Sequence, residues 1–270
     1  MIKLDDDLNS NRIVFPSRLK NKSIAFKISI GAMMTALNSV ITVVFAINIP
    51  TSEGGYFNIG ESAVYLTAIL FGPYIGAIAG GFGAFFADLF LSAAIFAPGS
   101  LIIKGLEGFI VGFVYHRLVN RLDTSKQQFR KNKIKILTIH IIISIIITCG
   151  IIIIGLMSFM GEANFFRIFE KIYLFNVKFT YIFWTIIGVL TLASLLLLQF
   201  FYDKTITSKI LAMLCGGSII ILGYFLYEIP IIGISAAYFE IPFNLMQIFL
   251  GIAIAVPISS PIMKNVNLFS

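Results

Sequence analysis

The sequence has few charged residues: Asp, Glu, Lys and Arg make up 12% of its 270 residues, about half the share that soluble globular proteins use to cover their surface. Its two cysteines, Cys149 and Cys215, lie inside long apolar segments without CxxC spacing, so they support neither a disulfide framework nor a thiolate metal site. The sequence also lacks the GxxxxGK[ST] phosphate loop, the HExxH zinc motif and the GxSxG nucleophile elbow. These absences exclude most soluble enzyme classes.

Histidine is equally scarce, with only His116 and His140. We expect both at the membrane surface, far from the acidic residues described below, so the sequence supports no His–carboxylate metal site or general base. We therefore expect no enzyme activity, no cofactor and no metal. The net charge of +7 does not indicate nucleic-acid binding, because the basic residues cluster between apolar runs, as in the cytoplasmic loops of membrane proteins.

Apolar residues are abundant, at 58% of the chain with a mean hydropathy of +0.95. Because a spanning helix needs about 20 mostly apolar residues, we predict an all-α, polytopic integral membrane helical bundle with about eight transmembrane helices. The predicted spans are 26–49, 60–72, 74–96, 101–118, 136–160, 179–201, 209–228 and 241–262. The second ends at Gly72-Pro73 and is expected to cross only part of the bilayer, because about 13 residues rise about 20 Å.

The distribution of basic residues predicts the orientation. With an even number of helices both termini share one side, and that side collects 16 of the 20 Lys and Arg residues. Arg167, Lys171 and Lys178 lie on the other side, and Lys104 lies within a helix. The positive-inside rule therefore places both termini in the cytoplasm of a multi-pass cell-membrane protein. Residues 1–25, which contain no signal-peptide core, are predicted to be a cytosolic tail.

Polar residues inside the predicted helices are the main functional signal, since a charge at the bilayer centre costs roughly 2.5–3.5 kcal/mol. The ionisable residues within the second, third, fourth, seventh and eighth spans fall in the outward half of their helices, and residues three, four or seven apart share a helix face. We predict that they line one outward-facing pocket. The alternative is that each extends to water or forms an internal ion pair, such as Lys104 with Asp88 or Glu107. The predicted pocket residues are Tyr56, Asn58, Glu61, Tyr65, Asp88, Lys104, Glu107, Tyr224, Glu228, Asn244 and Gln247.

The composition of this pocket indicates the kind of ligand. With Glu240, five acids accompany one lysine, which favours a neutral or cationic small heterocycle over an anion. Aromatic residues at the same depth, including Tyr238 and Phe239, would stack on a flat ring, although membrane interfaces attract aromatics in any case.

Small residues form two further patterns. Gly72, Gly76 and Gly80 give successive small-xxx-small steps, which predict close packing between helices inside the bundle. Ala32 and Ala36 form an AxxxA face on the first helix. That face is compatible with internal packing or with docking of another membrane protein.

Several blocks resemble the substrate-binding S components of energy-coupling factor (ECF) vitamin transporters, closest to the riboflavin-type family. The similar blocks are PTSEGGYFNIGE (50–61), VYL (64–66), LFGP (70–73), GAIAGG (76–81), ADL (87–89), FAP (96–98), IKGLEG (103–108), GYFLYE (223–228) and EIPFNLMQ (240–247), with Gly251. The resemblance covers residues 26–120 and about 210–262.

This resemblance implies a subunit that captures a vitamin or vitamin precursor from the outside. It also implies partners, namely a transmembrane coupling subunit and two ATPase subunits, with Ala32 and Ala36 meeting the coupling subunit. The family usually has six helices, so we divide the chain into an S-component core (26–120 and 209–264) and an inserted basic loop and transmembrane hairpin (121–208), which we expect to face lipid.

Two other functions remain open from the sequence. One is an intramembrane enzyme acting on lipid or isoprenoid, with Asp88, Glu107 or Glu228 as acid or base. The other is a proton-coupled secondary transporter using Asp88 or Glu107, which would require these acids near the membrane midplane. The vitamin itself is also open: riboflavin, thiamine precursors and pyridoxine all fit the predicted groups.

Overall fold

The fold comes from a computed structural model that describes residues 22–48, 55–124, 133–158, 161–163, 166–168, 171–173, 177–179, 181–201 and 205–266. Most of the predicted cytosolic tail (1–25) and residues 50–54 of the first family-like block lie outside these ranges.

Eight helices make up most of the described chain, and short strands connect some of them. The helices are α2 (Ile24–Val44), α3 (Glu61–Phe71), α4 (Pro73–Phe90), α5 (Ala97–Thr124), α7 (Lys133–Ser158), α8 (Tyr181–Phe201), α9 (Ile206–Ile232) and α10 (Ile234–Val266). The strands are β1 (Ile47–Asn48), β2 (Tyr56–Phe57), β3 (Gly161–Ala163), β4 (Phe166–Ile168), β5 (Lys171–Tyr173) and β6 (Val177–Phe179). The strands pair as three antiparallel two-stranded sheets, β1–β2, β3–β6 and β4–β5.

Length and hydropathy confirm the polytopic helical bundle. Six of the described helices are long and apolar enough to cross a membrane, whereas α3 and the searched part of α8 (Tyr181–Leu197) are shorter. At 11 residues, α3 rises about 16 Å, as expected for a partial span. The polypeptide reverses at Gly72, whose φ of 89° is unfavourable for residues with a side chain, and α4 starts at Pro73.

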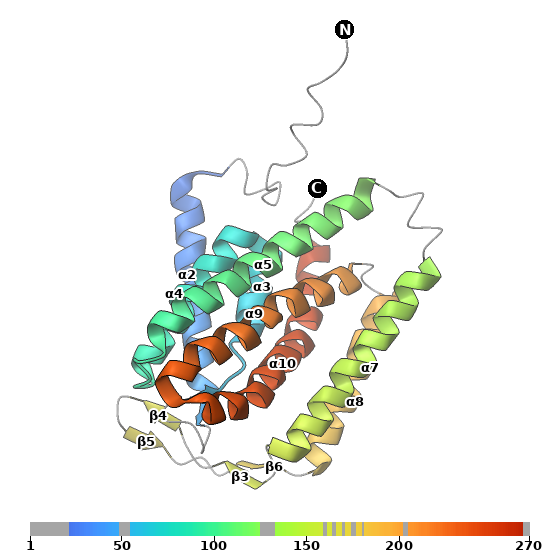
Figure 1. The fold of residues 1–270 in the computed structure, drawn as a ribbon. Helices are drawn as coiled ribbons and strands as arrows, with labels where there is room; N and C mark the ends of the chain where they lie inside the picture. Colours follow the sequence, from blue (N-terminus) through green and yellow to red (C-terminus); the bar gives the residue numbers. More distant parts are fainter. Residues whose placement is uncertain are drawn as a thin grey trace.

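Successive helices run in opposite directions, so the beginning of α2 and the end of α10 lie at the same end of the bundle (Figure 1). The short strands and the α4–α5 and α9–α10 connections lie at the opposite end, which we call the strand end (Figure 1). The even number of passes assumed for the orientation is therefore present.

The helix boundaries differ from the hydropathy-based prediction most clearly at the α4–α5 and α9–α10 connections. The predicted span 74–96 ends early, at Phe90, because Ser92 adopts a left-handed conformation (φ 59°). The backbone N–H of Ala93 donates to Asp88 O at 2.8 Å and that of Ser92 to Leu89 O at 3.4 Å, the pattern of a Schellman cap. Conversely, α9 continues past its predicted end at Glu228, and α10 begins at Ile234, before its predicted start at Ile241. Pro230 lies inside α9 and Pro242 inside α10.

The glycine face packs inside the bundle, as predicted. A Cβ atom on Gly80 would lie 2.5 Å from the carbonyl oxygen of Lys104, and one on Gly76 would lie 2.8 Å from the carbonyl oxygen of Gly108. Only glycine lets α4 approach α5 this closely. This close contact fixes the position of Lys104 along the axis of α4.

Helices α7 and α8 pack against each other as a hairpin, and both lie along α10 (Figure 1). The prediction of surface histidines is wrong. His140, on α7, is fully buried with its Nε2 atom 3.1 Å from Leu195 O of α8, and His116, on α5, is buried beside the carbonyls of Ala68 and Ile69. A nearby backbone carbonyl explains each case, because burial of an imidazole costs less when it is hydrogen-bonded.

Candidate ligand-binding site

Five helices bring their charged residues to the strand end of the bundle. These residues lie at the beginning of α3, α5 and α10 and near the end of α4 and α9. Glu61 and Glu107 are fully buried and Asp88 is 1% exposed, so they do not extend outward to water. The polar stripes therefore point into the bundle.

Most of the predicted residues share one pocket. The pocket is lined by eight of them, namely Tyr56, Asn58, Asp88, Lys104, Tyr224, Glu228, Asn244 and Gln247. Glu240 also lines it. The other three predicted residues, Glu61, Tyr65 and Glu107, are buried beside the lining: Glu61 pairs with Lys104, and Glu107 lies next to Lys104 and Tyr65.

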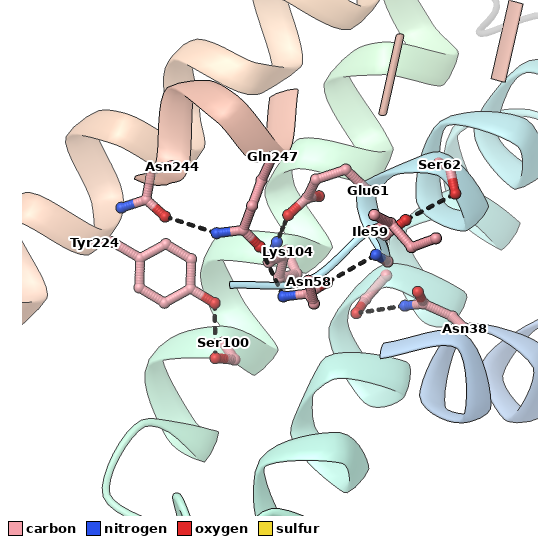
Figure 2. A network of polar contacts seen from close by, with 12 residues as sticks. Asn38, Asn58, Ile59, Glu61, Ser62, Ser100, Lys104, Tyr224, Asn244 and Gln247 are labelled. Carbon is pink, nitrogen blue, oxygen red and sulfur yellow. Dashed lines mark hydrogen bonds and ion pairs between the residues drawn. The ribbon is translucent and has the colours of Figure 1, made fainter. Parts of the chain in front are cut away.

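The single lysine of the pocket forms its ion pair with Glu61 (Figure 2), whereas the alternative had named Asp88 or Glu107 as examples of its partner. Lys104 Nζ also lies 5.7 Å from the centroid of the Tyr224 ring, within range of a cation–π contact. The spacing within α5 had suggested Glu107, but the first residue of α3 reaches Lys104 from the neighbouring helix.

Amide side chains join the loop after α2 to α10 (Figure 2). Asn58 Nδ2 donates to Gln247 Oε1 at 2.6 Å, and Gln247 Nε2 donates to Asn244 Oδ1 at 3.2 Å. Asn58 Oδ1 accepts from the backbone N–H of Gly60 at 2.7 Å, at the beginning of α3. The three amides therefore present a continuous row of donors and acceptors.

Two tyrosines occupy the side of the pocket towards α4 and α5. Tyr56 donates to Asp88, and burial raises the pKa of the Tyr56 phenol well above its usual range, so this group stays a donor. Tyr224 OH lies 2.7 Å from Ser100 Oγ (Figure 2). The predicted lining role of Tyr238 and Phe239 is wrong, because they are 59% and 64% exposed on the outer face of α10.

The polar lining has more hydrogen-bond acceptors than donors. Among the described lining residues, the buried carboxylate oxygens Asp88 Oδ2 and Glu228 Oε2 accept no hydrogen bond. Buried acceptors are costly when unsatisfied. The pocket is thus suited to a ligand that donates several hydrogen bonds.

In this conformation the side chains largely fill the pocket, leaving about 40 Å³ of free volume. Sites for small molecules are usually in the range of about 300–1,000 Å³. A ring-sized ligand must therefore displace side chains such as the Asn58–Gln247 pair.

Sequence reasoning missed lining residues that carry no charge. Asn38 and Thr42 of α2 and Ser100 of α5 line the pocket. Asn38 Nδ2 donates to Ala79 O of α4 at 3.0 Å. Two sequence signals could have identified these residues. Asn38 is an amide in the middle of an apolar helix, and Ser100 lies four residues before Lys104.

The comparisons with known proteins agree with this architecture. The family model described as "ECF-type riboflavin transporter, S component" matches residues 23–199, from the beginning of α2 into α8. The chain is 46% identical over 77 residues to "Uncharacterized protein in gap 3'region" of Pyrococcus woesei, covering 28% of this chain and 49% of that protein. It is 35% identical over 104 residues to "Thiamine precursor transporter HmpT" of Lactococcus lactis subsp. cremoris (strain MG1363), covering 38% of this chain and 62% of that protein.

Both relatives are matched over less than two thirds of their own length. The family model, in contrast, matches well over half of this chain, and its region contains α2 to α5, which supply much of the pocket. The chain therefore belongs to the family of ECF-type riboflavin transporter S components, and its long apolar helices agree with a multi-pass membrane protein.

Proposed function

We propose that this S component captures a small nitrogen heterocycle with exocyclic amino or hydroxyl groups, of the kind found in thiamine precursors, in the pocket at the strand end. The observation that carries the proposal is the convergence of five acids, four amides and one lysine on one buried site. The similarity to a protein named for thiamine-precursor transport supports the same class of ligand.

The charge of the site supports a neutral or cationic ligand. Four carboxyl groups remain after Lys104 pairs with Glu61, and like charges repel strongly at low local dielectric. A phosphorylated vitamin would meet this surplus of acid. An aminopyrimidine would instead donate its N–H groups to the unsatisfied carboxylate oxygens.

Entry is proposed from the strand end, which we place outside the cell. The strand end lies opposite the ends that carry most of the basic residues, and the positive-inside rule places those ends in the cytoplasm. The placement of Glu61 at the beginning of α3 and of Asp88 two residues before the end of α4 supports a receptor more than a proton path across the midplane.

Release of the ligand into the cell is proposed to need a separate coupling module with a transmembrane subunit and two ATPases. Ala32 and Ala36 support this step, because both are exposed on α2 and do not pack inside the bundle. Small exposed residues let a partner helix approach closely. We propose that this face contacts the transmembrane coupling subunit, and that α7 and α8 form an accessory to the six-helix core.

The deciding experiment is calorimetry on the purified chain with a panel of a hydroxymethyl-aminopyrimidine, thiamine, pyridoxine and riboflavin, in the absence of ATP. We expect one-to-one binding of the aminopyrimidine. Binding of riboflavin alone would retain the receptor function and reject the ligand class. No binding by a folded preparation, together with proton-dependent uptake by the chain alone, would favour a secondary transporter instead.

A further inference from the structure

A second hollow, of about 490 Å³, lies between α8 and the core, on the other side of β2 from the polar pocket. We call it the apolar hollow, and it is lined by Phe45, Ile47, Phe57, Ile59, Phe183, Trp184, Ile187, Leu190, Thr191, Ser194, Leu250, Ala253 and Ile254. Its lining contains two hydroxyl groups and no charged side chain. Water is therefore a poor occupant.

Side chains around β2 point alternately into the polar pocket and into the apolar hollow. Tyr56 and Asn58 line the polar pocket, whereas Phe57 and Ile59 line the apolar hollow. Successive residues of an extended segment point to opposite sides. One short segment thus forms a wall with a polar face and an apolar face.

The hollow is open towards the surroundings of the bundle. Leu190 is 63% exposed, Phe45 is 49% exposed and Phe183 is 37% exposed, although all three contribute to the lining. The adjoining helices α2 and α10 are long and apolar enough to span a membrane, so what surrounds these side chains is lipid. A hollow open to lipid and unfavourable for water is expected to fill with lipid.

Its length fits one layer of the bilayer. On α8 the lining runs from Phe183 to Ser194, which at 1.5 Å per residue is about 16 Å. One leaflet contributes about half of the roughly 30 Å hydrocarbon core. The lining begins near the strand end of α8, so the hollow extends over a single leaflet.

We propose that the apolar hollow binds one acyl chain of a bilayer phospholipid from the leaflet at the strand end, and that this chain fills the space between the inserted hairpin and the core. The bound chain packs against Phe57 and supports the segment that carries Tyr56 and Asn58. The proposal does not depend on the identity of the vitamin.

Trp184 provides a direct test, because it is the only tryptophan of the chain, is 2% exposed and lines the hollow. The protein is reconstituted into detergent-free bilayers of phosphatidylcholine with brominated acyl chains, which quench tryptophan fluorescence on contact. We expect strong quenching in the unmodified protein. Ser194→Phe and Ala253→Phe, which each fill part of the hollow from a different helix, are expected to reduce quenching by about twofold or more.

The matched control is Val189→Phe, which adds the same ring on α8 at a position 63% exposed and outside the hollow. Its quenching should equal that of the unmodified protein. Quenching unchanged by both filling variants in folded protein would overturn the proposal, as would equal losses in the filling variants and the control. Two filling variants are used so that misfolding of one leaves the test intact.

Discussion

The helices around the polar pocket (α2–α5, α9 and α10), here called the core, and the α7–α8 hairpin differ in the polar groups that they bury between their helices. In the core, α4 approaches α5 at glycines, and buried carboxyl and amide groups from five helices face one pocket. In the hairpin, α7 and α8 are almost wholly apolar and pack around Gly155 and Gly188, with His140 and Ser144 as buried polar residues of α7. The comparison shows that the carboxyl groups facing the pocket belong to the core, whereas apolar contacts predominate within the hairpin.

The largest effect is expected when a large side chain is introduced on an exposed helix face. Ala32→Trp should reduce uptake to background while ligand binding by the isolated chain stays unchanged, because an indole prevents close approach of the coupling subunit to α2. Uptake of labelled ligand, measured in cells that co-express a coupling module, reports the effect.

The control for this variant is Ile142→Trp, at a 50% exposed position of α7. It should retain uptake. Full uptake with Ala32→Trp would refute the docking role of α2, and loss of uptake with Ile142→Trp would show that the hairpin also docks.

A second test removes the amide row of the pocket. Asn244→Ala combined with Gln247→Ala should weaken binding about 100-fold, because each buried hydrogen bond contributes about 1–2 kcal/mol and 1.4 kcal/mol is a factor of ten. Calorimetry measures the dissociation constant. Ser259→Ala, which removes a hydroxyl near the other end of α10, should bind normally. Equal affinities in all three proteins would remove these amides from the site.

A third, smaller effect is expected at the aromatic side of the pocket. Tyr224→Phe removes the hydroxyl 2.7 Å from Ser100 and should weaken binding about fivefold, corresponding to about 1 kcal/mol. Tyr227→Phe is the matched control, because its hydroxyl donates to Ile95 O at 2.8 Å outside the pocket lining. If the two variants bind equally well, Tyr224 does not contact the ligand through its hydroxyl.

The smallest effect is expected in the hairpin. Ser144→Ala removes a hydroxyl 3.4 Å from His140 Nε2 and should lower the free energy of unfolding by less than about 1 kcal/mol, as is usual for polar contacts between membrane helices. Thermal unfolding in detergent measures this change, and ligand affinity should not change. A loss of affinity comparable to that of Asn244→Ala would show that the hairpin and the pocket are coupled.

Much of the candidate site was predictable because polar residues are rare in membrane-spanning helices, so each one indicates a specific role. A buried Glu61 or Asp88 stands out in an apolar span, and helical spacing assigns Asn244 and Gln247 to one face. Some uncharged lining residues were missed, since Asn38 and Thr42 resemble the small polar residues that occur in many spans. The partner of Lys104 was missed because helical spacing describes neighbours on one helix and not the approach of α3.

The sequence by itself determined the membrane class, the number and alternation of the helices, and the end at which polar side chains gather, since these follow from hydrophobic length and from the cost of charge in lipid. Only the tertiary structure decided which acid pairs with Lys104, that Ala32 is left exposed, that both histidines are buried, and that β2 divides a polar pocket from an apolar hollow. These features depend on which side chains from distant segments occupy the same space, and the spacing along one helix does not specify that.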